Sequence, residues 1–253
     1  MLNHKIFGQG DPVIILHGLF GMLDNWQTIA KKLAEEYMVI LVDQRDHGRS
    51  EHTDEFNYQV LAEDLNAFLE ENWIHTCHII GHSMGGKTAM QFATMHPDMV
   101  EKLIVVDIGV REYQPGHELI FKALLEVPIE KVQSRNEVEE IISKYIDDEG
   151  VRLFLMKNLQ RIKGGGFRWK MNLNLLHKEY QNILAAIKSE EAVDVDTLFI
   201  YGSKSKYIKE SDFDGIQSIF PEAIFEEVDA GHWIHADKPQ ELLEIVKAFL
   251  IND

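Results

Sequence analysis

The pattern of apolar residues along the chain alternates between two kinds of segment. The first kind is a short run of apolar residues, often β-branched, which is typical of a strand buried on both faces of a parallel sheet. Runs with this signal occupy residues 13–16, 38–42, 78–80, 102–106, 197–201 and 224–228. The second kind has apolar residues at helical spacing, as in Trp26, Ile29, Ala30 and Leu33. Strands that alternate with helices predict an α/β fold, with right-handed crossovers and helices on both faces of a mostly parallel sheet.

Residues 110–190 interrupt this alternation. They contain no strand-like run and predict several short helices, with glycines at 164–166 as the most flexible point. Because the segment lies between two predicted strands of one sheet, we expect it to form a small helical cap over one edge of that sheet. No repeat, low-complexity tract or linker marks off a second unit. We therefore expect residues 1–253 to form a single domain that carries the cap as an insertion.

Composition and charge exclude several classes of protein. The 253 residues are 45% hydrophobic and 26% charged, which is ordinary for a globular protein and excludes a disordered chain. The net charge of −17 argues against nucleic acid or an anionic membrane as a partner, because both would repel this surface. The single cysteine, Cys77, excludes an internal disulfide and a cysteine-based zinc cluster. The first residues lack the apolar core of a signal peptide, so we expect a cytoplasmic protein.

The candidate chemistry begins where the predicted strand 78–80 is followed by Gly-His-Ser-Met-Gly at 81–85. This G-x-S-x-G pattern lies between a buried strand and a helix, which is the setting of a nucleophile elbow. A sharp turn there would expose the hydroxyl of Ser83 at the N-terminus of a helix, where developing negative charge is stabilised. We therefore expect Ser83 to be a catalytic nucleophile.

A serine hydroxyl is a poor nucleophile unless a base accepts its proton. His232 follows the last predicted strand, 224–228, in the sequence Asp-Ala-Gly-His-Trp at 229–233. Because the carboxyl ends of parallel strands converge at one edge of a sheet, His232 can approach Ser83. His235, a turn further along, is the alternative base. No H-E-x-x-H or similar ligand spacing occurs, so we expect neither a metal nor a cofactor.

The base must in turn be oriented by a buried carboxylate. An acid is expected in the turn after strand 197–201, but Ser205 stands there, and the nearest carboxylates downstream are Glu210 and Asp212. Asp107 follows the neighbouring strand, 102–106, and has apolar neighbours. Because adjacent strand ends are about 5 Å apart, an acid on this strand preserves the geometry. We predict Asp107 as the acid, and a hydrogen bond from Ser205 to Asp107 or His232.

The remaining parts of a hydrolytic site are an oxyanion hole and an apolar lining. The sequence His-Gly-Leu-Phe-Gly at 17–21 follows a strand, and the N–H of Leu19 can pair with that of Met84 to form the hole. Phe20 and Trp233 are predicted to line the substrate site. Trp169, in the cap, is a further candidate. Lysines at 204, 206 and 209 are a candidate basic patch near its mouth.

Several of these segments together resemble one family. They are HGLFG at 17–21, DNW at 24–26, DQRDHGRS at 43–50, GHSMGGKTAM at 81–90 and AGHW at 230–233. Across nearly the whole chain they resemble the α/β-hydrolase fold and, more narrowly, the bacterial YbfF-type esterases, relatives of the abhydrolase-domain proteins. The resemblance implies the order Ser83, Asp107, His232, with Ser205 at the usual acid position. One departure is Asp46, where the family usually has Asn, and a single strand is expected before residue 13.

The expected function is therefore that of a serine hydrolase acting on small-molecule carboxylic esters through an acyl-enzyme intermediate. The resemblance implies acyl-CoA thioesters as further substrates. A carbon–carbon bond hydrolase or lyase on the same fold would use the same triad and stays open as an alternative. A non-catalytic ligand-binding protein that kept the fold is a third reading. The sequence does not indicate the physiological substrate or the oligomeric state.

Overall fold

The computed structural model describes residues 2–251, which form a seven-stranded sheet in the order β1-β3-β2-β4-β5-β8-β9. Neighbouring strands are parallel except for β1, which pairs antiparallel with β3 at the edge. The strands are β1 His4–Phe7, β2 Pro12–Leu16, β3 Met38–Val42, β4 Cys77–His82, β5 Val100–Val106, β8 Asp196–Gly202 and β9 Ile224–Val228. Every strand expected from the sequence is present, and β1 is the single strand expected before residue 13.

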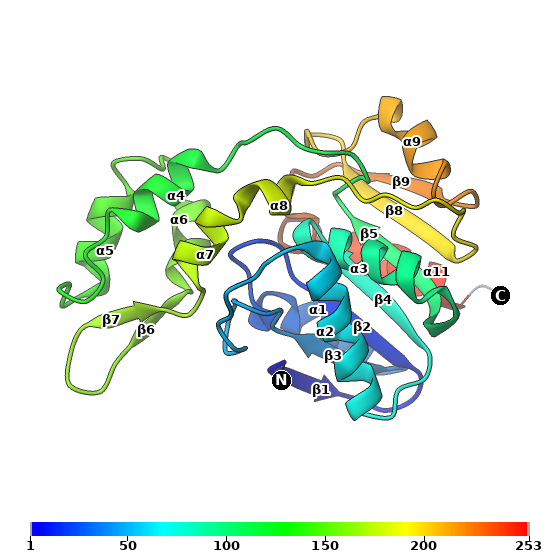
Figure 1. Cartoon of the computed structure of the whole chain (residues 1–253), viewed down its shortest axis with the longest axis horizontal. Coiled ribbons are helices and arrows are strands. Elements are labelled where there is room, and N and C mark those ends of the chain that lie inside the picture. The colour runs from blue at the N-terminus through cyan, green and yellow to red at the C-terminus, as the bar shows by residue number, and fades with distance from the viewer. Residues whose placement is uncertain (1, 252–253) are drawn as a thin grey trace.

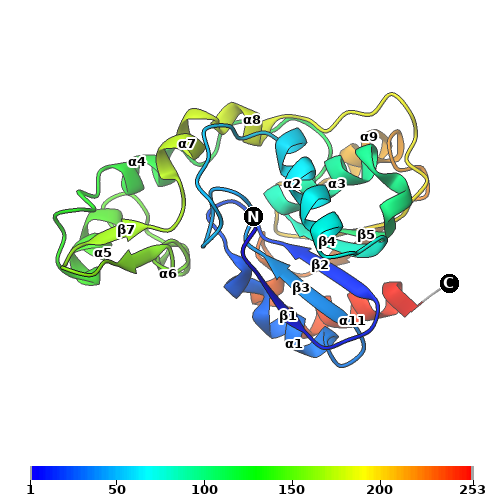
Figure 2. The ribbon, with the colours of Figure 1, turned by 60° about the horizontal axis from the view of Figure 1, so that its bottom comes forward.

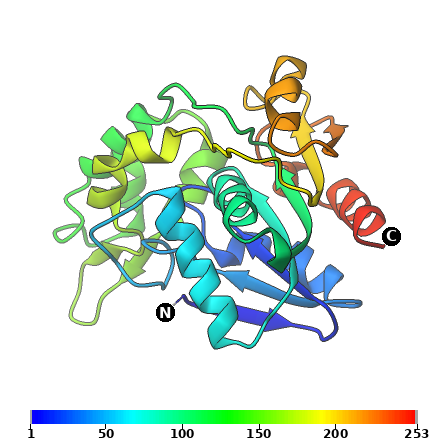
Figure 3. The same ribbon diagram turned by 45° about the vertical axis from the view of Figure 1, so that its right-hand side comes forward.

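Helices cover both faces of the sheet (Figures 1 and 3). Because side chains alternate along a strand, Val13 and Ile15 of β2 face one layer while Ile14 and Leu16 face the other. The main helices are α1 Gln27–Leu33, α2 Tyr58–Glu71, α3 Met84–Met95, α9 Phe213–Gln217, α10 Ile234–Asp237 and α11 Pro239–Ile251. Helices α1 and α11 pack together on the first face, and α2 and α3 pack together on the second.

The chain between β5 and β8 forms a separate group of elements at the carboxyl ends of the strands (Figures 1 and 2). These elements are α4 Glu118–Leu125, α5 Arg135–Ile142, α6 Glu149–Met156, β6 Leu159–Arg161, β7 Phe167–Trp169, α7 Leu173–Lys178 and α8 Tyr180–Leu184. Side chains cap two of the short helices, since Ser134 accepts a hydrogen bond from the third residue of α5 and Asp148 from that of α6.

The expectation that residues 110–190 contain no strand is wrong. Strands β6 and β7 form an antiparallel hairpin, in which Leu159 pairs with Trp169. The three glycines at 164–166 all have positive φ and form its turn. Each strand has only three residues, of which one is fully buried, so the pattern along the sequence is too short to reveal it. Within residues 2–251, no helix is long and apolar enough to cross a membrane.

Candidate active site

Ser83 lies in the tight turn between β4 and α3, with φ 53° and ψ −121°. Its N–H donates to the carbonyl of Val106 on the neighbouring strand (3.0 Å), which holds the turn against the sheet. The turn needs glycine on both sides. A Cβ on Gly81 would lie 2.3 Å from the carbonyl oxygen of Gly85, and one on Gly85 would lie 2.4 Å from that of Leu16. The G-x-S-x-G spacing therefore follows from the close approach of strand, turn and helix.

Asp107 and His232 meet at the carboxyl ends of β5 and β9. Asp107 comes directly after β5, has φ 53° and is fully buried. Its Oδ2 accepts a hydrogen bond from Nδ1 of His232 (2.7 Å), and its Oδ1 accepts one from the N–H of Gly202 (3.0 Å). With Nδ1 carrying the proton, Nε2 of His232 is left unprotonated and can accept another. His232 and Ser83 line the same cavity.

Ser205 lies beside this pair, and the expected hydrogen bond is present: its hydroxyl donates to Oδ2 of Asp107 at 2.5 Å. The oxygen of Ser205 in turn accepts from the N–H of Tyr207 (3.2 Å). The Tyr207 ring stacks on the His232 imidazole, with ring centroids 4.0 Å apart. Ser205 thus contacts Asp107, while Tyr207 covers one face of the His232 ring. Tyr207 was missed at the sequence level because nothing in its neighbourhood indicates a ring contact 25 residues away.

Leu19 and Met84 line a small cavity together with Ser83. Among residues 2–251, neither of their backbone amides donates a hydrogen bond to another protein atom, so both are available to an oxyanion. The next amide, that of Phe20, is different because it donates to Nε2 of His47 (3.3 Å). Phe20 itself has φ 60°, a left-handed conformation that turns the chain at this point.

Two buried histidines hold the loop that contains Leu19. Nε2 of His17 accepts from the N–H of Gln44 (3.1 Å), and Nδ1 donates to the carbonyl of Gly18 (2.8 Å). His47 donates from Nδ1 to the carbonyl of Arg45 (3.0 Å) while its Nε2 accepts from Phe20. Burial lowers the pKa of His17 to about 4 and that of His47 to about 3, so both rings are neutral and each keeps one acceptor nitrogen.

The cavity at Ser83 is mostly apolar, with Phe20 and Trp233 among its lining residues. Phe154 of α6 packs against Trp233, with ring centroids 5.6 Å apart. His235, the alternative base, also lines this cavity. Its ring stacks on Trp26 (4.6 Å), and burial lowers its pKa to about 4. The hydrogen bond to Asp107 is made by His232, not His235.

Trp169 does not line the cavity at Ser83. It lies with Arg49, Arg168 and Lys170 in a separate groove between β7 and the loop at 48–52. Lys204, from the basic patch expected near the mouth, instead pairs with Asp229 (2.7 Å). No group of three or more His, Cys, Asp or Glu side chains in the described part of the chain could hold a metal ion.

A mostly parallel sheet with a serine on a strained turn between strand and helix, and a histidine and an aspartate at neighbouring strand ends, defines an α/β hydrolase. The chain belongs to the α/β-hydrolase fold family, whose family model matches residues 11–129. It is 37% identical to a mouse sn-1-specific diacylglycerol lipase, ABHD11, over 94% of this chain and 80% of that protein. It is also 35% identical to esterase YbfF of Escherichia coli, over 96% of this chain and 93% of that protein.

Among solved structures, a marine microorganism esterase superposes with a TM-score of 0.96 and 41% sequence identity, covering 98% of both chains. The resemblance to YbfF-type esterases is thereby confirmed. The protein is a carboxylic ester hydrolase, which excludes the reading of a non-catalytic binding protein.

Proposed function

We propose that the protein cleaves carboxylic esters with Ser83 as nucleophile, His232 as general base and acid, and Asp107 as the carboxylate that orients His232. The observation that carries this proposal is the 2.7 Å hydrogen bond between Asp107 and His232, together with the shared cavity of His232 and Ser83. The positive φ of Ser83 supports it further, since backbone strain of this kind concentrates at functional sites.

In the acylation step, the hydroxyl oxygen of Ser83 attacks the ester carbonyl carbon while Nε2 of His232 takes the hydroxyl proton. The amides of Leu19 and Met84 donate hydrogen bonds to the oxygen on which negative charge develops. When the tetrahedral intermediate collapses, the bond to the alcohol oxygen breaks, and that oxygen receives the proton from His232.

In the deacylation step, a water gives a proton to His232 and attacks the acyl carbon bound to Ser83. The second tetrahedral intermediate collapses with return of the proton to the serine oxygen, which releases the carboxylic acid. Asp107 stays ionised and stabilises the imidazolium of His232 in both steps. Ser205 holds one oxygen of Asp107 in place through its hydroxyl.

We also propose that the chain is one domain in which residues 110–190 act as a cap on the substrate cavity. Side chains of this segment contribute to that cavity, among them Phe154 and His117. Its buried Phe121 and Leu124 belong to the same hydrophobic cluster as α2 and α3. A continuous core of this kind is typical of an insertion within a domain, because an independent domain has a core of its own.

The test of the nucleophile is the initial rate of hydrolysis of p-nitrophenyl esters from acetate to palmitate. Wild-type turnover should show an optimum of acyl-chain length, and Ser83→Ala should lower kcat by about 10⁶-fold. The matched control is Ser203→Ala, because Ser203 is exposed and its hydroxyl donates to Asp229, outside the site.

Full activity of Ser83→Ala would contradict the assignment of Ser83 as the nucleophile. If wild type cleaves no ester but cleaves a vinylogous diketone in a Ser83-dependent way, the carbon–carbon bond hydrolase would replace the esterase. That alternative uses the same three residues, so only the substrate separates the two reactions.

A second candidate substrate class, thioesters of a phosphate-bearing carrier such as CoA, is favoured by the groove at Trp169. In a chain with a net charge of −17, this groove is lined by Arg49, Arg168 and Lys170 and by no acidic residue. Cationic side chains that line a groove suit phosphate groups, and Trp169 offers a face on which a nucleobase can stack.

This second class is tested with butyryl-CoA against butyryl-N-acetylcysteamine, which has the same thioester without phosphates. We expect wild type to have the higher kcat/KM on butyryl-CoA, and Arg168→Gln with Lys170→Gln to remove that preference without changing the rate on the truncated substrate. Equal kcat/KM values on both substrates in wild type would contradict a phosphate-binding role of the groove.

A further inference from the structure

Two linkers connect the segment of α4 to α8 with the sheet, and they run beside each other (Figures 1 and 3). We call residues 110–113 of the first linker and 184–187 of the second the neck. Backbone hydrogen bonds join the two linkers in both directions, from the N–H of Tyr113 to the carbonyl of Leu184 (2.9 Å) and from the N–H of Ile187 to that of Val110 (2.8 Å). The cap is therefore attached through a short paired segment.

Lys87 lies directly under this neck. It is on α3, one helical turn after Ser83, and its side chain is almost completely buried. Its Nζ donates a hydrogen bond to the carbonyl of Arg111 (2.7 Å) and another to the carbonyl of Ala185. The two acceptors belong to different linkers. One ammonium group therefore joins the helix of the nucleophile to both linkers of the cap.

The surroundings of Lys87 are those of a buried cation without a counter-ion. Within residues 2–251, no carboxylate forms an ion pair with it, although the charge of Glu112 acts on it from a distance. Its Nζ lies 4.9 Å from the ring centroid of Tyr113 and 5.7 Å from that of Tyr58. Burial, with a contribution from Arg111, lowers the pKa of the amine to about 7. An apolar side chain would fill this space without the cost of removing an ammonium from water. What the amine adds is its ability to donate to both linkers at once.

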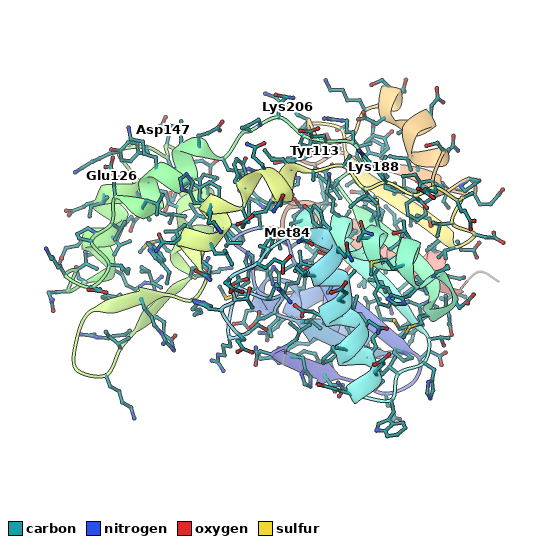
Figure 4. The ribbon with its side chains drawn as sticks, viewed as in Figure 1. Met84, Tyr113, Glu126, Asp147, Lys188 and Lys206 are labelled. Atoms are coloured by element: carbon teal, nitrogen blue, oxygen red, sulfur yellow. The ribbon has the colours of Figure 1, made fainter. Side chains whose placement is uncertain are left out.

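The neck is connected to the proposed catalytic groups through Tyr207 and through a cavity that Ser83 also lines. Lys87 lines a small second cavity, whose walls include Ser83 and Tyr113. The hydroxyl of Tyr113 donates to the carbonyl of Tyr207 (2.6 Å), and the ring of Tyr207 covers His232. A shift of the neck would therefore move one wall of this cavity together with the ring that packs on the base. Figure 4 labels Met84 on α3 and Tyr113 on the first linker.

We propose that Lys87 is a positioning residue of the esterase reaction, because its side chain fixes both linkers of the cap to the helix of Ser83 and so sets the cavity wall beside the nucleophile. The proposal rests on the proposed function in that Ser83 carries the acyl group. It assigns Lys87 no contact with the reacting atoms.

The test compares Lys87→Met, which has nearly the same length but no donor, with wild type. Without Lys87, the carbonyls of Arg111 and Ala185 lose their partner, so we expect amide hydrogen exchange at Tyr113 and Ile187 to become about 10-fold faster. We also expect kcat/KM for long-chain p-nitrophenyl esters to fall by about 10-fold to 100-fold, with a smaller loss on the acetate. Lys87→Gln keeps donors on a shorter side chain and should lie in between, and it carries the test if Lys87→Met does not fold.

The control is Val246→Ala, which removes buried apolar volume on α11, on the opposite face of the sheet, far from the neck. Amide exchange and ester hydrolysis of each variant are measured at the same number of degrees below its own Tm. If Lys87→Met and Val246→Ala give the same neck exchange and the same chain-length profile, Lys87 only stabilises the fold and the proposal is overturned. The exchange measurement needs no substrate, so a failure of the proposed esterase reaction is recognised separately by inactive wild type.

Discussion

Among single residues, Asp107 has the most demanding environment in the site. It is fully buried, and its two oxygens accept hydrogen bonds from His232, Ser205 and the amide of Gly202. An ionised carboxylate needs such partners when it is removed from water. Their arrangement also fixes which nitrogen of His232 carries the proton, so the proposed roles of Asp107 and His232 depend on each other.

The substitution Asp107→Asn should lower kcat on p-nitrophenyl esters by about 10⁴-fold, because an amide in place of the carboxylate favours the wrong tautomer of His232. The fold should be unchanged, since Asn has the same shape and also tolerates positive φ. Circular dichroism and steady-state kinetics check both points. Asp229→Asn is the control, because Asp229 is exposed and paired with Lys204. If Asp107→Asn kept normal activity while Asp229→Asn lost it, the acid would have to be reassigned.

Ser205→Ala should have a much smaller effect than Asp107→Asn. It removes one hydrogen bond to a charged group, while the bonds from His232 and Gly202 to Asp107 remain. We expect kcat to fall by about 10-fold, the size of one such bond. A loss as large as that of Asp107→Asn in the same assay would give Ser205 a direct part in proton transfer.

Loops and strand ends set the relative positions of these residues. The loop at 43–50 holds the loop that contains Leu19 through His17 and His47. It also contacts the cap, since the carbonyl of Asp46 accepts a hydrogen bond from the N–H of Asn172. Its Asp46, at the position where Asn is usual, has φ 63° and is fully buried. Oδ1 of Asp46 accepts from the N–H of Thr53 and from Nδ2 of Asn172, and Oδ2 accepts from the hydroxyl of Thr53.

Asp46→Asn should leave stability within about 1 kcal/mol of wild type. The new amide can donate to the hydroxyl of Thr53, which can then give its proton to the carbonyl of Glu55, its other neighbour at 3.0 Å. Asp46→Ala loses all three bonds and puts a residue with no such partners at positive φ, so we expect a loss of about 2 kcal/mol. Urea unfolding of the three proteins measures this. Equal destabilisation by Asn and Ala would show that the charge itself is needed.

Some elements could be predicted from the sequence and others could not. Strand β3 begins and ends where the apolar run does, because a strand buried in a parallel sheet is apolar along its whole length. Strand β9 also has the predicted bounds, but it is an edge strand, and its Glu226 and Glu227 are exposed. The β6–β7 hairpin was missed because three-residue strands carry no usable period. The position of Trp169 depends on this hairpin, which explains why the groove at Trp169 was not foreseen.

For the whole molecule, the number of buried neutral histidines predicts sensitivity to acid. Burial lowers the pKa of His17, His117 and His235 to about 4, that of His47 to about 3, and that of His82 well below its usual value. Between pH 6.5 and about 4 these rings bind protons in the unfolded chain but not in the native protein. The unfolded state therefore binds more protons, and stability falls as pH falls through this range.

Each such histidine lowers the free energy of unfolding by about 1.4 kcal/mol per pH unit in this range. Urea unfolding at several pH values from 7.5 to 4.5 measures the slope. His47→Gln, which keeps a hydrogen-bond acceptor for Phe20 but cannot bind a proton, should show a slope smaller by about that amount. Identical slopes for wild type and His47→Gln would mean that His47 is protonated equally in both states.

The sequence by itself determined the fold class and the glycine-flanked turn at Ser83. These follow from local requirements: apolar runs for buried strands, glycines at 81 and 85 where backbone segments nearly touch, and a serine between them. Asp107 and His232 were also proposed from the sequence, because Asp107 directly follows β5, His232 lies in the loop after β9, and strand ends meet at one edge.

Only the tertiary structure decided the contacts between segments that are distant in sequence. The hydrogen bonds of Lys87 to two linkers, the stacking of Tyr207 on His232 and the basic groove at Trp169 each join such segments. No local pattern encodes them, because each depends on how the inserted segment packs against the sheet. Lys87 looks in the sequence like an ordinary helix lysine, and only its burial under the neck reveals its partners.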